Sequence, residues 1–572
     1  MRRSGIICSF FLEQLRFSRI LAEFFRPMAK HLKSILAVSL STFGSRVLGL
    51  VRDSLAGFFF GTSAINSAFS WAFTLPNLFR RLVGEGALSS AFIPVLSEAL
   101  EEGGRTEAFR FLNQVITRLA VSLTGTVAVL IAVILAAHGV GIYASAHGYM
   151  QLPERVYWGF DFSVVLMPYL LLVCVTAALL GALNVLGHYA VTGLSQVWLN
   201  ISMIVSLGLF GMYFGKTDLE RMYWQCGGVL VGGLLQVALP SITLWREGWR
   251  PRWDWTLSPR LREMMRIFLP GLLGASIYQI NIVTSRCVAF GLNDSATTVL
   301  YYSQRLMELP LGMFTIAFAT VMFPKISLLA AQNDRDGMAR TYAQGLRLIL
   351  AVTIPAALGL FALREPIVSV LYEHGKFDAQ SVAEVAPVLA ISALGIPFFS
   401  LATLAIRGFY AQKDMRSPVL VAKIDFFLNI GLTLVLAGPF GARGLAMANL
   451  ASAIFQAFML QRLLIHRGTA LARPPIGRAA IAVGLAGVGM LAFTLAGWWA
   501  LRSAFGMDKA AWLFHMRVGD VAAVIVLIPV SIIVYLIFLR LARFEEWPQL
   551  QELMELFLLR RKRTKNASSR QA

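Results

Sequence analysis

The stretch SRVLGLVRD (residues 45–53) places two arginines and an aspartate inside an apolar segment, and it decides the kind of fold. That segment covers about residues 34–60, which is long enough to cross a bilayer as a helix. An ionisable group at membrane depth costs at least ~2.5 kcal/mol, so it normally faces a watery cavity or a partner. Arg46 and Arg52 lie about 120° apart around such a helix. Because Asp53 can balance only part of this charge, the pattern indicates a binding surface for an anion.

The composition is that of a membrane protein. The 572 residues are 57% hydrophobic and 14% charged, with a mean hydropathy of +0.67. Soluble globular proteins carry roughly 25% charged residues. The net charge of +20 does not indicate nucleic-acid binding, because most lysines and arginines lie between apolar runs, where they set topology. The four cysteines are scattered and show no spacing typical of disulfides or metal sites.

Apolar runs of about 20 residues recur along the chain and predict an all-α polytopic membrane protein with about fourteen transmembrane helices. The predicted spans cover residues 34–60, 64–83, 109–137, 156–186, 191–214, 223–246, 264–291, 296–324, 343–372, 381–411, 417–438, 441–465, 476–501 and 518–541. An even number of spans places both termini on one side of the membrane. Arginines gather in the loops on that side, as in residues 246–266 and 560–563, so both termini are predicted to be cytoplasmic.

Two parts of the chain resemble each other at a separation of six spans. Leu75-Pro76 is followed by Phe92-Ile93-Pro94, and Leu309-Pro310 is followed by Phe323-Pro324. Because six is even, the two halves would share one orientation, as in transporters built from parallel repeats. The last two predicted spans lie outside this repeat.

Several motifs together resemble the MurJ (MviN) family of lipid II flippases. They are SRVLGLVRD at 45–53, LPNLFRR at 75–81, GEGA at 84–87, YYSQRLMELP at 301–310 and RGFYA at 407–411. The resemblance runs from about Met28 to the last span, and it implies the MOP-superfamily fold. It divides the chain into an N-terminal lobe (28–248), a C-terminal lobe (249–466), a helix pair forming a groove for a lipid tail (467–541) and a basic cytoplasmic tail (542–572).

The resemblance also implies a function, and it implies a transporter without catalytic residues. The substrate would be lipid II, the undecaprenyl-pyrophosphate-linked precursor of peptidoglycan, flipped outward across the bacterial inner membrane by alternating access. The implied partners are lipid II, membrane lipids and the cell-wall synthesis machinery, with the chain itself a monomer. Nucleic acid is not among them.

Site residues follow from matching the family motifs position by position. The resemblance assigns substrate binding to Arg46, Arg52 and Arg305, and arginine suits a pyrophosphate because guanidinium stays charged and binds phosphate bidentately. A second set is expected to line the cavity or act as a gate. Its members are Asp53, Arg80, Arg81, Glu85, Gln304 and Glu308.

Each assignment has a structural alternative. Arg46 or Arg52 could hold a neighbouring helix, and the side chains of Arg52 and Asp53 leave the helix about 100° apart, which predicts no direct pairing. Arg305 and Glu308 have the spacing of an ordinary intrahelical ion pair. Arg80 and Arg81 lie near a helix end, where they could simply anchor the topology.

The chain departs from the family pattern at three positions, as we align it. Ser67 stands where many relatives have aspartate, Thr74 where they have lysine, and Gln304 where they have an acidic residue. These departures remove the ions from which a gate salt bridge in this region would be built. Asn66 offers a polar contact but no charge.

No cofactor is expected, but transport could be coupled to a Na⁺ or H⁺ gradient or to the membrane potential. Asp425 and Asn429 share one helix face and are candidate Na⁺ ligands, with simple structural pairing as the alternative. Lys423 points elsewhere. A Walker A motif is missing from the sequence, which argues against direct use of ATP.

Two rival transport functions stay open on the sequence. A MATE-like multidrug or cation antiporter would need an acidic cavity, whereas the residues here predict a basic one. A flippase for another polyprenyl-linked oligosaccharide would share the basic cavity, and only the family motifs separate it from a lipid II flippase.

Two further segments have their own patterns. Residues 1–27 precede a start typical of the family at Met28, so they are either an amphipathic extension or the result of a start codon assigned too early. Arg250, Trp253 and Trp255 indicate a segment at the membrane interface before residue 264.

Overall fold

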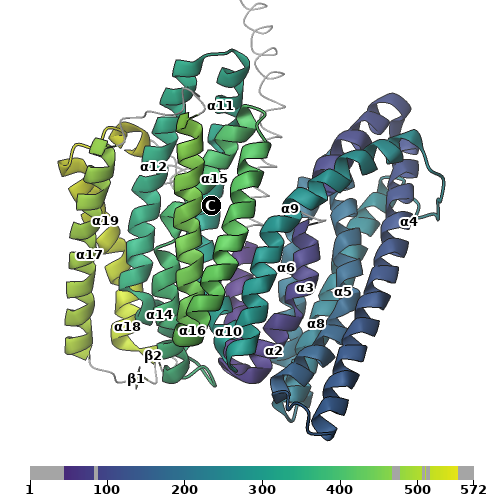
Figure 1. Cartoon of the computed structure of the whole chain (residues 1–572), viewed down its shortest axis with the longest axis horizontal. Coiled ribbons are helices and arrows are strands. Elements are labelled where there is room, and N and C mark those ends of the chain that lie inside the picture. The colour runs from purple at the N-terminus through teal and green to yellow at the C-terminus, as the bar shows by residue number, and fades with distance from the viewer. Residues whose placement is uncertain (1–43, 83–87, 467–476, 506–508, 511–515, 552–572) are drawn as a thin grey trace, which may run out of the picture. The chain divides into compact units, whose positions relative to one another are not determined.

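The computed structural model describes residues 44–82, 88–466, 477–505, 509–510 and 516–551, and nearly all of them are helical (Figure 1). Residues 1–27 and Glu85 lie outside the described residues. The two short strands β1 (Lys509–Ala510) and β2 (Met516–Arg517) pair antiparallel, with Lys509 opposite Arg517. The all-α fold class is therefore confirmed.

The helices follow the apolar runs of the sequence. After a first helix over residues 44–60, they are α2 (Ala64–Ala72), α3 (Thr74–Phe79), α4 (Leu88–Ala146), α5 (Glu154–Val185), α6 (Tyr189–Val205), α7 (Met212–Phe214), α8 (Asp218–Arg246), α9 (Pro259–Leu292), α10 (Ala296–Pro310), α11 (Ile316–Ala331), α12 (Arg335–Ala362), α13 (Arg364–Tyr372), α14 (Ala379–Ala393), α15 (Ile396–Ala411), α16 (Arg416–His466), α17 (Gly477–Phe505), α18 (Val518–Ala522) and α19 (Ile528–Leu541). π-Helical segments follow or connect some of them in the described residues, namely residues 80–82, η2 (Ser206–Gly211), η3 (Leu311–Thr315) and η6 (Ala523–Leu527).

Eight helices among the described residues are long and apolar enough to cross a bilayer. The bent pair α14 and α15, which meet at 41°, would make a ninth. The number of about fourteen spans stays a prediction. Residues 64–82 are not a single helix but two short helices and a π-helical turn, whereas α16 is interrupted by the non-helical backbone of Gly441, in agreement with the separate 417–438 and 441–465 spans.

The two Leu-Pro motifs of the predicted repeat lie in similar local structures. Leu75-Pro76 belongs to α3, which passes directly into π-helical residues 80–82. Leu309-Pro310 ends α10, which passes directly into η3. Proline removes a helical hydrogen bond and clashes with the preceding turn, so a local change of helix type is expected beside it. In transporters, broken helices of this kind often lie at substrate sites.

The chain folds into two compact units. The first contains residues 1–55, 75–152 and 160–275, and the second contains residues 56–74, 153–159 and 276–572. In the first unit α6 packs closely along α8. A Cβ at Gly228 would lie 2.7 Å from the Ser206 side chain and one at Gly232 would lie 2.8 Å from Leu199, so only glycine allows this approach. Ser202 Oγ also donates to the Gly228 carbonyl at 2.8 Å.

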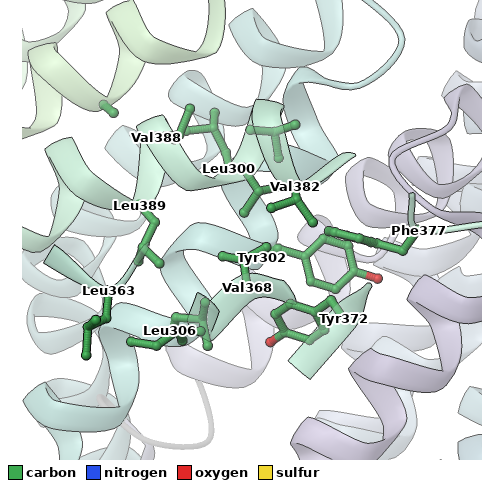
Figure 2. Packing of buried hydrophobic residues seen from close by; sticks show 14 of the residues in the cluster. Leu300, Tyr302, Leu306, Leu363, Val368, Tyr372, Phe377, Val382, Val388 and Leu389 are labelled. Carbon is green, nitrogen blue, oxygen red and sulfur yellow. The ribbon is translucent and has the colours of Figure 1, made fainter. Parts of the chain in front are cut away.

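The second unit has a core of aromatic and aliphatic side chains (Figure 2). Tyr302 of α10 lies with its ring centre 4.7 Å from that of Tyr372 of α13 and 5.2 Å from that of Phe377. Offset and edge-to-face ring contacts at such distances add about 0.5–1.5 kcal/mol beyond the burial of apolar area. Leu300 and Leu306 of α10 extend the same core.

Two glycine turns lock residues 58–61 to residues 374–377 within the second unit. Gly61 and Gly375 both have positive φ, at +56° and +60°. A Cβ at Gly61 would strike the Lys376 carbonyl, and one at Gly375 would strike the Phe58 carbonyl. The Lys376 amide donates to that same Phe58 carbonyl at 2.9 Å. The backbones therefore approach closely at a place where other residues would be strained.

The last two long helices, α17 and α19, pack against each other and against α12, also in the second unit (Figure 1). Thr494 Oγ1 contacts Ser531 Oγ at 2.8 Å, and Tyr535 Oη donates to the Ala351 carbonyl at 2.8 Å. Their other faces expose large apolar side chains, including Ile481, Leu485 and Ile533. Such faces suit hydrocarbon and not water.

Candidate functional site

Arg52 is a buried charge on the first helix, and it bridges that helix to α6. Its guanidinium donates to Asp53 Oδ1 from Nε at 3.0 Å and from Nη2 at 2.6 Å, and from Nη1 to Asn200 Oδ1 at 3.1 Å. The exposed fractions are 8% for Arg52 and 2% for Asp53. Asn200 in turn donates from Nδ2 to the Ser45 carbonyl at 3.0 Å. Ser45, Arg52 and Asp53 of the motif thus form one connected network with Asn200 of α6.

The expectation that neighbouring Arg52 and Asp53 would not pair directly is wrong. Their Cα–Cβ bonds do diverge around the helix, but the arginine side chain is long and its guanidinium folds back onto the carboxylate. The alternative expectation, a contact to another helix, is met at the same time through Asn200. Arg52 is therefore held on two sides, which fixes the position of its charge.

The other predicted site arginines of the first unit are less buried than Arg52. Arg46 is half-buried, six residues before Arg52 on the same helix. Arg80 and Arg81 occupy the π-helical turn after α3, where both are half-buried and Arg80 Nε donates to Asn77 Oδ1 at 3.4 Å. A contact within one turn is compatible with either anchoring or binding of a headgroup, so the role of this pair stays a prediction.

Arg305 and Glu308 form the intrahelical ion pair that their spacing allows. Arg305 Nη1 lies 3.4 Å from Glu308 Oε2 on α10, and the Glu308 side chain is 46% exposed. Gln304 is half-buried beside them. These residues belong to the second unit, whereas Arg46 and Arg52 belong to the first. The convergence of all three arginines on one headgroup therefore stays a prediction.

Arg286 is a charge that the sequence analysis overlooked. It lies on α9 in the second unit, half-buried, and its Nη1 donates to Thr74 Oγ1 at 2.9 Å. Thr74 is one of the departures, at a position where lysine was expected. The structure brings a cation from another helix to that position. The sequence does contain a sign of this residue, because Arg286 is a charge within the mostly apolar predicted span, in INIVTSRCVAF (residues 280–290).

Ser67 is paired as well. Its hydroxyl lies 2.8 Å from Thr298 Oγ1 of α10, and both residues are buried. Asn66 donates from Nδ2 to the Gly61 carbonyl at 2.7 Å. The polar surroundings of α2 are thus uncharged hydrogen bonds where the family pattern has an acid.

A second polar cluster joins the two halves of α16. Ser452 Oγ donates to Asp425 Oδ1 at 2.5 Å, and Asn429 Nδ2 donates to Asn449 Oδ1 at 3.1 Å. Asp425, Asn429 and Thr433 follow each other at four-residue steps and are all buried. Lys423 is exposed, so it does point elsewhere. Within the described residues there is no group of three His, Cys, Asp or Glu side chains that would hold a metal ion on its own.

Comparison with known proteins identifies the family. The family model "Lipid II flippase MurJ" matches residues 58–473. A "Probable lipid II flippase MurJ" of Rhizobium meliloti is 32% identical over 441 residues, covering 76% of this chain and 81% of that protein. One of Vibrio cholerae is 34% identical over 451 residues, covering 76% and 83%.

Solved structures agree on the fold. A structure of "Lipid II flippase MurJ, inward closed conformation" superposes with a TM-score of 0.67 at 24% identity, covering 88% of this chain and 98% of that one. An inward-facing MATE transporter of the MOP superfamily follows with a TM-score of 0.61 at 13% identity, covering 77% and 98%. The chain is a multi-pass inner-membrane transporter and not an enzyme, and it belongs to the MurJ family of lipid II flippases.

Proposed function

We propose that this chain moves lipid II from the cytoplasmic to the periplasmic leaflet by alternating access. The observation that carries the proposal is the buried Arg52, which Asp53 and Asn200 hold on a helix that the sequence predicts to cross the membrane. A charged side chain inside the membrane costs free energy and usually has a function there. A guanidinium binds phosphate groups through two parallel hydrogen bonds, so a pyrophosphate is a suitable ligand. The names of the relatives supply the identity of the cargo.

In this mechanism the carboxylates pair with the arginines before the substrate binds. Asp53 pairs with Arg52, and Glu308 pairs with Arg305. These ion pairs lower the desolvation cost of the arginines. The pyrophosphate would then compete with the carboxylates for the guanidinium donors, with Arg46 contributing a further charge. Arg80, Arg81, Glu85 and Gln304 would act in gating.

The proposed topology follows the positive-inside pattern, with both termini in the cytoplasm. The chain acts as a monomer, in contact with membrane lipids and with the machinery that uses lipid II. The helix pair α17 and α19 would hold the isoprenoid tail, because its outward faces are apolar.

Complementation tests the substrate class. A bacterium depleted of its own lipid II flippase would express the chain from Met1 or from Met28, at matched levels in the membrane. We expect growth to be restored together with lipid II accessible at the outer face. Growth without accessible lipid II, or correct insertion without growth, would instead favour another polyprenyl-linked glycan as the cargo.

We further propose that Asp425 couples transport to a cation, Na⁺ or H⁺, with Asn429 as a second oxygen donor. The support is the buried Asp425 carboxylate, which accepts from the Ser452 hydroxyl, together with the side-chain amides of Asn429 and Asn449 that pair between the two parts of α16. Carboxylate and amide oxygens are the ligands that hard cations prefer.

The Asp425→Asn variant separates coupling from folding, because asparagine keeps the shape and can still accept from Ser452. We expect transport in proteoliposomes to lose its dependence on an imposed Na⁺ or H⁺ gradient, with the melting temperature nearly unchanged. Ser452→Ala is the matched control, since it removes the hydrogen bond but leaves the carboxylate. A variant that still responds fully to the gradient would assign Asp425 a structural role.

A further inference from the structure

Residues 250–258, between α8 and α9 in the first unit, have an inverted alternation of side chains. Asp254, Thr256 and Ser258 make hydrogen bonds to α4. The residues between and beside them, Trp253, Trp255 and Leu257, are 73%, 59% and 56% exposed. An extended chain on the surface of a soluble protein turns its apolar side chains inward and its polar ones outward. This segment does the opposite at Asp254 and Ser258, and the hydroxyl of the exposed Thr256 also accepts from Gln114 of α4.

The inward side is a built polar contact. Gln114 of α4 donates from Nε2 to Asp254 Oδ2 at 3.3 Å and to Thr256 Oγ1 at 2.8 Å, and its Oε1 accepts from Ser258 Oγ at 2.7 Å. Thr117 Oγ1 accepts from the Asp254 amide at 3.1 Å. Because Gln114 is itself buried, the register of the segment is fixed.

Three more hydrogen bonds hold the segment and the preceding Trp249 to α4. Trp249 is buried and donates from Nε1 to Asn113 Oδ1 at 2.9 Å, and Asn113 Nδ2 donates to the Arg250 carbonyl at 2.9 Å. Arg118 Nη2 donates to the Trp255 carbonyl at 2.8 Å. These contacts fix the backbone of the segment, so the fold itself keeps Trp253 and Trp255 exposed.

The charge of Asp254 belongs to this contact. Burial alone would raise the pKa of its carboxyl, but hydrogen bonds from Thr256 and Gln114 and the nearby Arg110 outweigh burial and lower the pKa. The negative charge of Asp254 is thus paired with residues of α4. The exposed charges on and just after the segment are mainly basic, since Arg252, Arg262 and Arg266 are all exposed and Glu263 is the one acid among them.

We propose that residues 250–258 are a membrane-interface anchor that inserts Trp253, Trp255 and Leu257 among anionic phospholipid headgroups. Tryptophan prefers this depth because its ring is apolar and its N–H is polar. The arginines beside it attract anionic lipid and bind the headgroup phosphates. Exposed Met265 and Leu269 continue the apolar surface into α9. The segment would thus fix the first unit against the lipid surface.

Depth-dependent quenching tests the anchor. The four native cysteines would be replaced and a fluorophore attached at Leu257→Cys, with the protein in nanodiscs that contain equal fractions of brominated lipid. We expect strong quenching at this position and none at Asp336→Cys, an exposed residue in the first turn of α12. No quenching at Leu257→Cys in correctly folded protein would overturn the proposal.

The headgroup preference is measured in the same samples. Brominated phosphatidylglycerol should quench more than brominated phosphatidylcholine, by about a factor of two or more. The Arg252→Gln/Arg262→Gln variant should lose this preference and keep its depth. Free inorganic phosphate should not reduce quenching, since lipid and not phosphate alone is the partner. Equal quenching by both lipids in the unmodified chain would contradict the anionic preference.

Discussion

Arg52→Ala is expected to abolish transport, and neutralising its partner as well is not expected to restore it. Removing the guanidinium alone leaves Asp53 buried without its arginine, which costs about 3–5 kcal/mol of stability. A loss of function in the single variant would therefore mix folding with substrate binding. The double variant Arg52→Gln/Asp53→Asn separates the two, because it replaces the ion pair by a neutral pair of similar shape.

The double variant should fold to near-normal levels, by thermal melting in detergent, and still fail to support growth or lipid II transport. Arg52→Lys keeps the charge but not the bidentate geometry, and it should keep partial activity. If the neutral double variant transports normally, Arg52 is only a helix-to-helix contact through Asn200. The proposed pyrophosphate site would then have to rest on other arginines.

The fold class could be predicted from the sequence, because apolar runs of bilayer length leave no other solution in hydrocarbon. The number of spans stays a prediction. Residues 416–466 are interrupted at Gly441, whose φ of 57° and ψ of −134° are not helical, and this agrees with the separate predicted spans 417–438 and 441–465. The limits of some helices could not be predicted, since the run at 64–82 is mostly apolar and yet divides into α2 and α3 at Phe73.

The charges of the candidate site were predictable, but their partners were not. The motif shows that Arg52 and Asp53 lie on one helix, whereas Asn200 comes from a helix almost 150 residues later. The helical angle of about 100° between neighbouring residues led to the wrong prediction for Arg52 and Asp53. It describes the direction in which side chains leave the helix and not where the end of a long arginine side chain lies. Contacts of this kind depend on tertiary packing and on rotamers.

The contact between Arg286 and Thr74 could not be predicted from the sequence of α3 alone. Thr74 looks like the loss of a cation when α3 is read alone, but the guanidinium of Arg286 lies 2.9 Å from its hydroxyl. We infer that Arg286 supplies the positive charge that the family pattern places at residue 74. Losing one member of a buried charge pair costs about 2–5 kcal/mol, and for the half-buried Arg286 we expect at least the lower end of this range. Arg286→Ala should therefore lower transport by about 30-fold or more at 1.4 kcal/mol per tenfold.

A charge transfer between the two positions provides the decisive comparison. Arg286→Ala/Thr74→Lys moves the cation from α9 to α3, and we expect it to recover a large part of the lost transport in proteoliposomes. Thr74→Val is the matched control, because it removes the hydroxyl but leaves the Arg286 charge, and it should cost about 1 kcal/mol of stability with most transport kept. If Arg286→Ala folds and transports normally, its charge has no part in the site. If the double variant folds but does not recover while Arg286→Ala is inactive, the guanidinium acts through its own geometry, and a cation at residue 74 cannot replace it.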